Sequence, residues 1–140
     1  MNYEAKVKYV KLDPLSGKEK TVSETYLLDA ETFGDAEVKT FKEMEKITNA
    51  TIIATIKKSD IADVIGDRDS SRFFKATVKQ TVIDELTGKE SSQNMAILCG
   101  CNNLKAAVLD IEEYAEKSIF DNEITKIGVS GIIGIFETEA

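Results

Sequence analysis

Two seven-residue stretches decide the fold: DPLSGKE at residues 13–19 and DELTGKE at residues 84–90. They lie 71 residues apart, and most of the chain falls into register at the same offset without a gap. Identical pairs on either side are Ala5 with Ala76, Val7 with Val78, Leu27 with Leu98, Ala36 with Ala107, Ile53 with Ile124 and Ile61 with Ile132. Two unrelated hairpins that share a common turn would not explain the later matches. The sequence therefore predicts a tandem duplication.

Each copy predicts the element order ββαβ. Residues 3–9 alternate between apolar and polar, which is the period of a half-buried strand. The Asp, Pro, Ser and Gly of residues 13–19 predict a hairpin turn with Gly17 at positive φ, and a second strand follows over residues 22–28. Residues 29–32 supply capping side chains for a helix from Phe33, and the Ile- and Thr-rich residues 50–58 predict a third strand.

In the second copy we expect a helix from Asn102 or Asn103 to about Lys117 and a third strand over residues 123–136. The predicted fold class is α+β: a tandem duplication of a ββαβ unit, with antiparallel-rich sheets, one helix per unit and a pseudo-twofold axis. The predicted boundaries are a first repeat at residues 1–66, a hinge at 67–71 and a second repeat at 72–140. Together they should form one compact globular unit. The polar run at residues 59–71 is the natural connection between the repeats.

The composition excludes several classes of active site. The chain has no histidine, which removes the usual general base near neutral pH and every Ser-His or Cys-His nucleophile pair. Cys99 and Cys101 are two residues apart, so a disulfide between them would be strained and two thiols alone do not complete a zinc site. We expect small buried or half-buried thiols, no enzymatic activity, no cofactor and no metal.

Two further motifs are weak. Gly17-Lys18 and Gly88-Lys89 resemble fragments of a phosphate-binding loop but lack the preceding glycine and the following helix. The acidic residues between Asp60 and Asp69 lack the ligand spacing of a calcium loop. Both are better explained as a hairpin turn and a solvated connection.

Charge is distributed unevenly along the chain. The net charge of −7 argues against simple attraction to nucleic acid, but the acidity concentrates on the helices, the connection and the tail. The hairpins are neutral to slightly basic, and their outward faces combine lysines with an aromatic residue. This combination is typical of a platform for single-stranded nucleic acid. The candidate nucleic-acid-binding residues are Lys6, Lys8, Lys18, Lys20, Arg72, Phe73, Lys75 and Lys79. The alternative is that these lysines only keep a sheet face soluble and protect its edge.

Four segments resemble a known family: YEAKVKY at residues 3–9, VSETYLLDAETFGDAEVKTFKEM at 22–44, SDI at 59–61 and RFFKA at 72–76. They are similar to an uncharacterised small-protein family of Bacteroidetes and the phages that infect them, including crAss-like phages. The chain departs from the pattern in a shorter hinge and in Gly34-Asp35 at the helix start. The family has no established activity, so it implies no catalytic residues. Its phage context implies a role in replication or in countering host defence, and the resemblance favours single-stranded DNA binding.

The predicted function is therefore a non-enzymatic single-stranded DNA-binding protein of a phage-type replication module. Phe73 would stack on bases while lysines contact phosphates, and the short footprint predicts a homo-oligomer. The alternative is a small protein that binds and inhibits or sequesters a host protein or a nucleotide signal, with protein partners at the acidic helices or tail. No stretch approaches a membrane-spanning length and the N-terminus lacks a signal-peptide core, so we expect a location in the bacterial host cytoplasm and no membrane partner.

Overall fold

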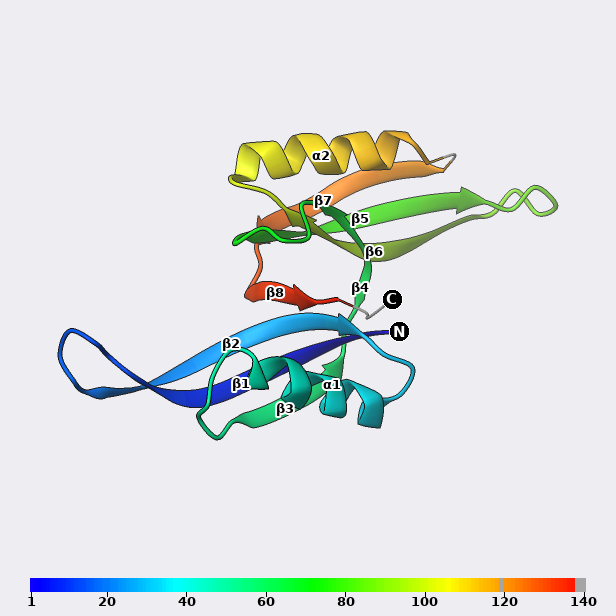
Figure 1. Cartoon of the computed structure of the whole chain (residues 1–140). Coiled ribbons are helices and arrows are strands. Elements are labelled where there is room, and N and C mark those ends of the chain that lie inside the picture. Colours follow the sequence, from blue (N-terminus) through cyan, green and yellow to red (C-terminus); the bar gives the residue numbers. More distant parts are fainter. Residues whose placement is uncertain (119, 138–140) are drawn as a thin grey trace. The chain divides into compact units, whose positions relative to one another are not determined.

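The computed structural model describes residues 1–118 and 120–137, which form an α+β protein with two four-stranded sheets, each of them mostly antiparallel (Figure 1). In chain order the elements are β1 Asn2–Leu12, β2 Glu19–Asp29, α1 Phe33–Glu45, β3 Ile53–Lys58, β4 Ile61–Gly66, β5 Phe73–Ile83, β6 Glu90–Gly100, α2 Leu104–Glu116, β7 Asp121–Val129 and β8 Ile132–Phe136. The chain divides into two compact units. Unit 1 contains Met1–Ser59 and Gly131–Glu137, and unit 2 contains the described residues between Asp60 and Ser130.

Unit 1 has the strand order β3-β1-β2-β8. β1 pairs antiparallel with β2 and β3, whereas β8 runs parallel to β2. One face of this sheet carries the core against α1, built from Tyr3, Ala5, Val7, Tyr9, Tyr26, Leu28, Ala36, Met44, Ile56 and Phe136. The opposite face carries the alternate residues of β1. It is covered at Leu27, which is 2% exposed, and we call its exposed part around Lys6 and Lys8 the open face of unit 1.

Unit 2 has the strand order β4-β6-β5-β7, with β4 parallel to β6 and the other pairs antiparallel. Its core against α2 contains Phe74, Ala76, Val78, Ile97, Cys99, Ala107 and Ile111. The bounds of β5, β6 and α2 are those of β1, β2 and α1 moved by 71 residues.

The two hairpin turns have the same geometry. Gly17 and Gly88 both have a φ of 68°, which confirms the predicted turn. The Asp13 carbonyl accepts a hydrogen bond from the Gly17 N–H at 2.8 Å, and the Asp84 carbonyl accepts one from Gly88 at 2.7 Å. In both turns the aspartate Oδ1 also accepts from the backbone N–H two residues on, at 2.9 Å. These bonds fix both turns in one conformation.

The helix starts agree with the predicted caps. Thr32 Oγ1 accepts from the Asp35 N–H at 3.1 Å, and Asn103 Oδ1 accepts from the Ala106 N–H at 2.8 Å. Both N-cap residues have extended backbone angles, as N-caps require.

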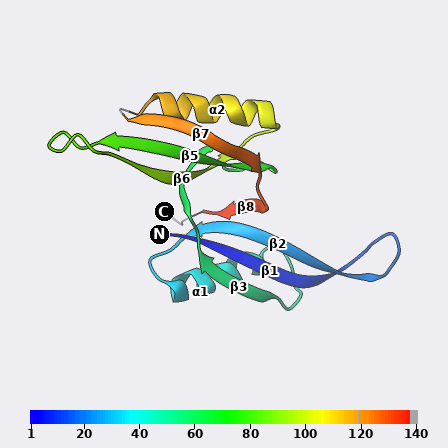
Figure 2. The same cartoon turned by 180° about the vertical axis from the view of Figure 1, so that it is seen from behind.

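The predicted ββαβ order is wrong at its end, because a further strand follows β3 in the first half of the chain and β7 in the second. The predicted last strand at residues 123–136 is interrupted at Ser130-Gly131 and gives β7 and β8, and the predicted polar connection at residues 59–71 contains β4. β4 follows β3 in the chain but pairs in the sheet of unit 2, whereas β8 follows β7 but pairs with β2 in unit 1 (Figures 1 and 2). The chain passes between the two compact units at residues 59/60 and 130/131. The repeat boundaries at residues 1–66, 67–71 and 72–140 stay predictions.

Candidate nucleic-acid interface

Lys6 and Lys8 lie on the open face of unit 1. The strand register places Lys6 opposite Thr25 and Thr55, and Lys8 opposite Ser23 on β2 and Ile53 on β3. Both lysines are exposed, and within residues 1–118 and 120–137 neither has an ion-pair partner. This row therefore presents two ammonium groups beside hydroxyl groups, with no carboxylate directly opposite either lysine.

The β1–β2 hairpin continues past the rest of the sheet as a two-stranded arm, residues 10–21, which we call arm 1. β3 pairs with β1 only as far as Lys8, and β8 pairs with β2 only from Thr25 onward. Every residue of arm 1 except Asp13 is exposed. An isolated two-stranded ribbon is marginally stable, so its length is not explained by core formation.

Arm 1 carries Lys20 and Lys18, but not on the predicted surface. Lys20 is directly opposite Lys11, and this pair lies on the α1 side of the sheet because Tyr9 and Val22 pair there next to it. Lys20 thus faces away from the side that carries Lys6 and Lys8. Sequence reasoning missed Lys11, although it continues the Tyr9 face of β1 by the same period of two.

The prediction that Phe73 is an exposed aromatic residue is wrong. Phe73 does share a face of β5 with Lys75 and Lys79, but its side chain is only 1% exposed. It pairs across the sheet with Gly100, where an added Cβ would lie 3.1 Å from the Phe73 ring. The glycine makes room for the ring to lie against the sheet, so the ring offers no free surface to a base.

Two of the three predicted cations of unit 2, Arg72 and Lys75, contact other groups. The Arg72 guanidinium lies 5.7 Å from the centre of the Phe74 ring and donates to the Asn102 carbonyl at 3.3 Å. Lys75 Nζ donates to Asp60 Oδ1 at 2.8 Å, in an exposed pair. Lys79 is exposed but stands opposite Glu123 of β7. Of the predicted residues, the lysines of unit 1 are therefore the better placed for a phosphate.

Glu24 lies at the base of arm 1, where the arm joins the rest of the sheet. Its Oε1 accepts from the Tyr9 hydroxyl at 2.6 Å and from the Tyr26 hydroxyl at 3.3 Å. The bond to Glu24 raises the pKa of Tyr9 to about 12, and burial together with this carboxylate raises the pKa of Tyr26. The carboxylate is held in place by these two donors.

The two thiols match the prediction, with Cys99 buried and Cys101 half-buried. Burial is the main cause that raises the pKa of Cys99 to about 12, so the thiol stays protonated at neutral pH. Its Sγ lies 3.7 Å from Asp110 Oδ2. Within the described part of the chain, no three potential metal-ligating side chains gather at one point.

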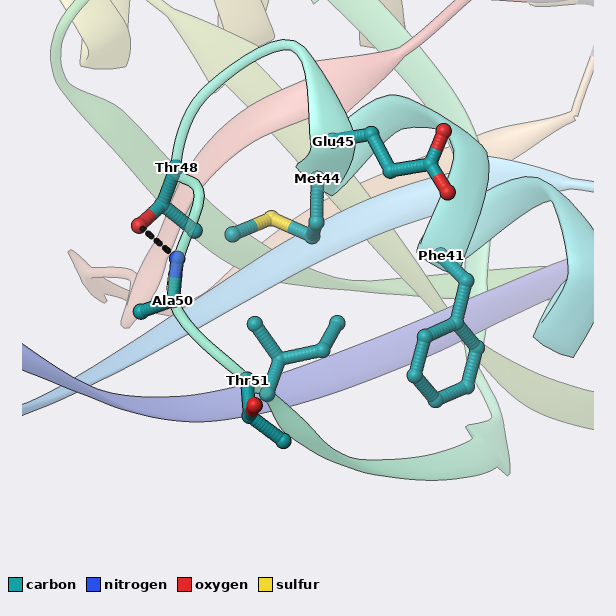
Figure 3. A pocket seen from close by; sticks show the side chains of 7 residues that line it. Phe41, Met44, Glu45, Thr48, Ala50 and Thr51 are labelled. Atoms are coloured by element: carbon teal, nitrogen blue, oxygen red, sulfur yellow. Dashed lines mark hydrogen bonds between the residues drawn. The ribbon is translucent and has the colours of Figure 1, made fainter.

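Two hollows of the described surface lie beside the helices. A cavity of about 230 Å³ lies at the end of α1, lined by Phe41, Met44, Glu45, Thr48, Ala50, Thr51 and Ile52 (Figure 3). Thr48 Oγ1 already accepts from the Ala50 N–H at 3.1 Å, and Glu45 is the one titratable side chain of the lining. A wider hollow beside α2 and β7 carries Glu112, Glu116, Asp121 and Glu123, and it would repel a polyanion.

Fold and site together define a small two-unit α+β protein with one parallel strand at the edge of each sheet and a lysine-bearing hairpin arm. A family model described as a domain of unknown function (DUF4494) matches residues 1–138, and the chain belongs to this family. The comparisons with curated proteins and with solved structures found no match. In the described residues, neither helix has the length and apolar character needed to cross a membrane.

Proposed function

We propose that this protein is a non-enzymatic single-stranded DNA-binding protein of a phage-type replication module, and that it binds through unit 1. The observation that carries the proposal is the exposed row of Lys6 and Lys8 on the open face. Residues i and i+2 of a strand are about 6.7 Å apart, so the two ammonium groups can contact neighbouring phosphates of an extended strand.

The surroundings of these lysines support the same function. Ser23, Thr25 and Thr55 flank them and offer hydroxyl donors, which commonly contact phosphates. With Phe73 buried, binding should depend on charge rather than on base stacking, and it should have little sequence preference.

We attribute the two units to a tandem duplication in which the fourth strands were exchanged. The equal bounds of three elements, the matching turns and the matching caps support this origin. The pseudo-twofold axis and the homo-oligomer remain predictions. The divergence between the copies supports a function carried by one unit.

The test is a fluorescence-anisotropy titration with labelled oligo-dT at low and moderate salt. Lys6→Gln/Lys8→Gln should weaken binding about tenfold at low salt and flatten its salt dependence. The matched control is Lys105→Gln/Lys117→Gln, which removes the same charge at exposed positions of unit 2 and should change affinity less than about twofold. No binding at micromolar protein, or equal effects of the two variants, would contradict the proposal.

A second candidate function is the binding of a partner protein, which would make this chain an inhibitor or a sequestering protein. The observation that favours it is the side chain of Val38, 67% exposed on α1 beside the 40% exposed Phe41. Affinity capture from host lysate, with Val38→Asp as the negative control, separates the two functions. Recovery of one stoichiometric protein that Val38→Asp does not retain, without DNA, would favour this candidate.

A further inference from the structure

Arm 1 contains a pair of like charges that the fold does not require. Lys11 and Lys20 stand directly opposite each other on adjacent strands. Like charges in this arrangement destabilise a β-ribbon. The equivalent positions of unit 2 hold Val82 and Ser91, which also pair directly in the same hairpin geometry.

Both carboxylates on this side of arm 1 accept hydrogen bonds from other groups, and within the described residues neither forms an ion pair with Lys11 or Lys20. Asp13 accepts from the Leu15 N–H at 2.9 Å, a bond that lowers its pKa and commits it to the turn. Glu24 accepts from two tyrosine hydroxyls. Glu19 pairs with Leu12 and therefore lies on the other face of the ribbon.

A third lysine strengthens the positive charge. Lys18 lies just before the first residue of β2, and its backbone bond to Asp13 continues the ladder of the ribbon, which places it on the same side as Lys11 and Lys20. The Lys18 carbonyl accepts from the Asp13 N–H at 2.9 Å, so the position is fixed by the turn. Three exposed lysines thus gather on one face of a ribbon whose edges have no neighbouring strand beyond Lys8 and Thr25.

We propose that Lys11, Lys18 and Lys20 form a phosphate clamp, a second binding site for the sugar-phosphate backbone of single-stranded DNA. This inference rests on the proposed function and adds three contacts on the side of the hairpin opposite Lys6 and Lys8. The free edge of β1 next to Val10 lets a single strand pass from one face of the hairpin to the other. Phosphate contacts at the clamp relieve the repulsion between Lys11 and Lys20, so ligand binding offsets the instability of the arm.

The experiment measures oligo-dT affinity against salt for wild type, Lys11→Val/Lys20→Ser and Lys6→Gln/Lys8→Gln. The first variant installs the residues that unit 2 carries at the same positions, so it should fold normally, which circular dichroism verifies. We expect its affinity to fall about tenfold at low salt and its slope in log–log form to decrease by about 1.4, since each lost phosphate contact contributes about 0.7. Lys18→Gln should weaken binding, whereas the equivalent Lys89→Gln should not.

The outcomes separate the clamp from the function on which it rests. If Lys6→Gln/Lys8→Gln weakens binding but Lys11→Val/Lys20→Ser changes neither affinity nor slope, the clamp is overturned and the proposed function stands. If wild type does not bind oligo-dT, both are overturned. The converse substitution, Val82→Lys/Ser91→Lys, should raise the affinity for oligo-dT. An unchanged affinity would show that a lysine pair on such an arm does not suffice for binding, and this result would count against the clamp.

Discussion

Arm 1 and its counterpart in unit 2, residues 81–92 (arm 2), share a backbone but differ in charge. Their turns have the same glycine φ and the same aspartate bonds. Arm 1 has lysines at 11, 18 and 20 against two carboxylates, whereas arm 2 has Lys89 against three. The cross-strand pair Val82–Ser91 of arm 2 carries no charge. At the base of arm 2, Gln93 Nε2 donates to Gln80 Oε1 at 2.9 Å. The turn residues determine the hairpin conformation in both arms. The residues at the cross-strand positions can therefore differ between the arms without changing the backbone.

The two helices also differ, although they cover their sheets at the same positions. α1 buries Thr40 and Met44, while α2 places Ile111 and Ala115 at the equivalent positions. Ile111 is larger than Thr40, whereas Ala115 is smaller than Met44. The two differences offset each other, so the side-chain volume under each helix is similar. Thr40 is accommodated because its hydroxyl donates to the Ala36 carbonyl at 2.8 Å.

The largest effect is expected at the end of β6. An added Cβ at Gly100 would lie 1.8 Å from the Asp67 carbonyl oxygen, so Gly100→Ala should destabilise unit 2 by about 3 kcal/mol. The equivalent residue of unit 1 is the exposed Asp29, which pairs with the N-terminal amino group. Asp29→Ala should cost less than about 1 kcal/mol in urea denaturation. Similar costs at the two positions would show that the sheet ends are packed alike.

The next effect compares the helices. Ile111→Ala should lower the free energy of unfolding by about 3 kcal/mol, because it leaves a cavity in a fully buried site. Ile111→Thr should cost only about 2 kcal/mol, since its hydroxyl can donate to the Ala107 carbonyl as Thr40 does in α1. Urea denaturation followed by circular dichroism measures both. If Ile111→Thr is the worse variant, the equivalence of the helix sites is wrong.

Local patterns predicted the elements that local interactions determine. Both turns, both helix caps and the first three strands of unit 1 follow from short-range residue choices around Gly17, Thr32 and their counterparts. The fourth strands were missed because their stability comes from parallel pairing with distant partners, β4 with β6 and β8 with β2. In β4 the acidic Asp63 interrupts the apolar residues, so the segment has no clear strand period.

The candidate site was predicted only in part, because some of its features also depend on pairing between strands that are distant in sequence. Alternation along β1 correctly placed Lys6 and Lys8 on one exposed face. Alternation cannot show that a glycine across the sheet lets Phe73 become buried, nor which lysine of β2 faces Lys11. Both facts depend on the register between strands, which the residues of one strand do not contain.

The turn aspartates should give equal and smaller effects in the two arms. Hydrogen bonds from backbone N–H groups lower the pKa of Asp13 and of Asp84 below the ordinary 3.8. A lowered pKa means that each ionised carboxylate stabilises the fold above pH 3.8 and that this contribution is lost as the pH falls through the folded-state pKa. Asp13→Ala and Asp84→Ala should therefore lower the melting temperature similarly at pH 7.

Thermal melts between pH 7 and pH 2 test this equality. The difference between wild type and each variant should stay constant down to about pH 4 and shrink below it. Asp13→Asn keeps an acceptor for the Leu15 N–H, so it should retain more stability than Asp13→Ala. Unequal effects of Asp13→Ala and Asp84→Ala would mean that the arms differ in their turns as well as in their charges.

The smallest expected effect concerns the stability of arm 1. It tests whether the lysines of this arm bind a ligand or only make the surface soluble. Lys11→Gln removes one of two facing like charges, so it should stabilise the protein by about 0.5 kcal/mol at low salt, and the gain should shrink at high salt. Val82→Lys/Ser91→Lys should destabilise arm 2 by a similar amount, whereas Val82→Lys alone should change little. Lysines that only confer solubility need not face each other. If Lys11→Gln stabilises the protein and also weakens oligo-dT binding, the lysine pair lowers stability in order to bind the ligand. A loss of stability in Lys11→Gln would instead mean that Lys11 holds the arm together, and the contrast with arm 2 would then be one of structure.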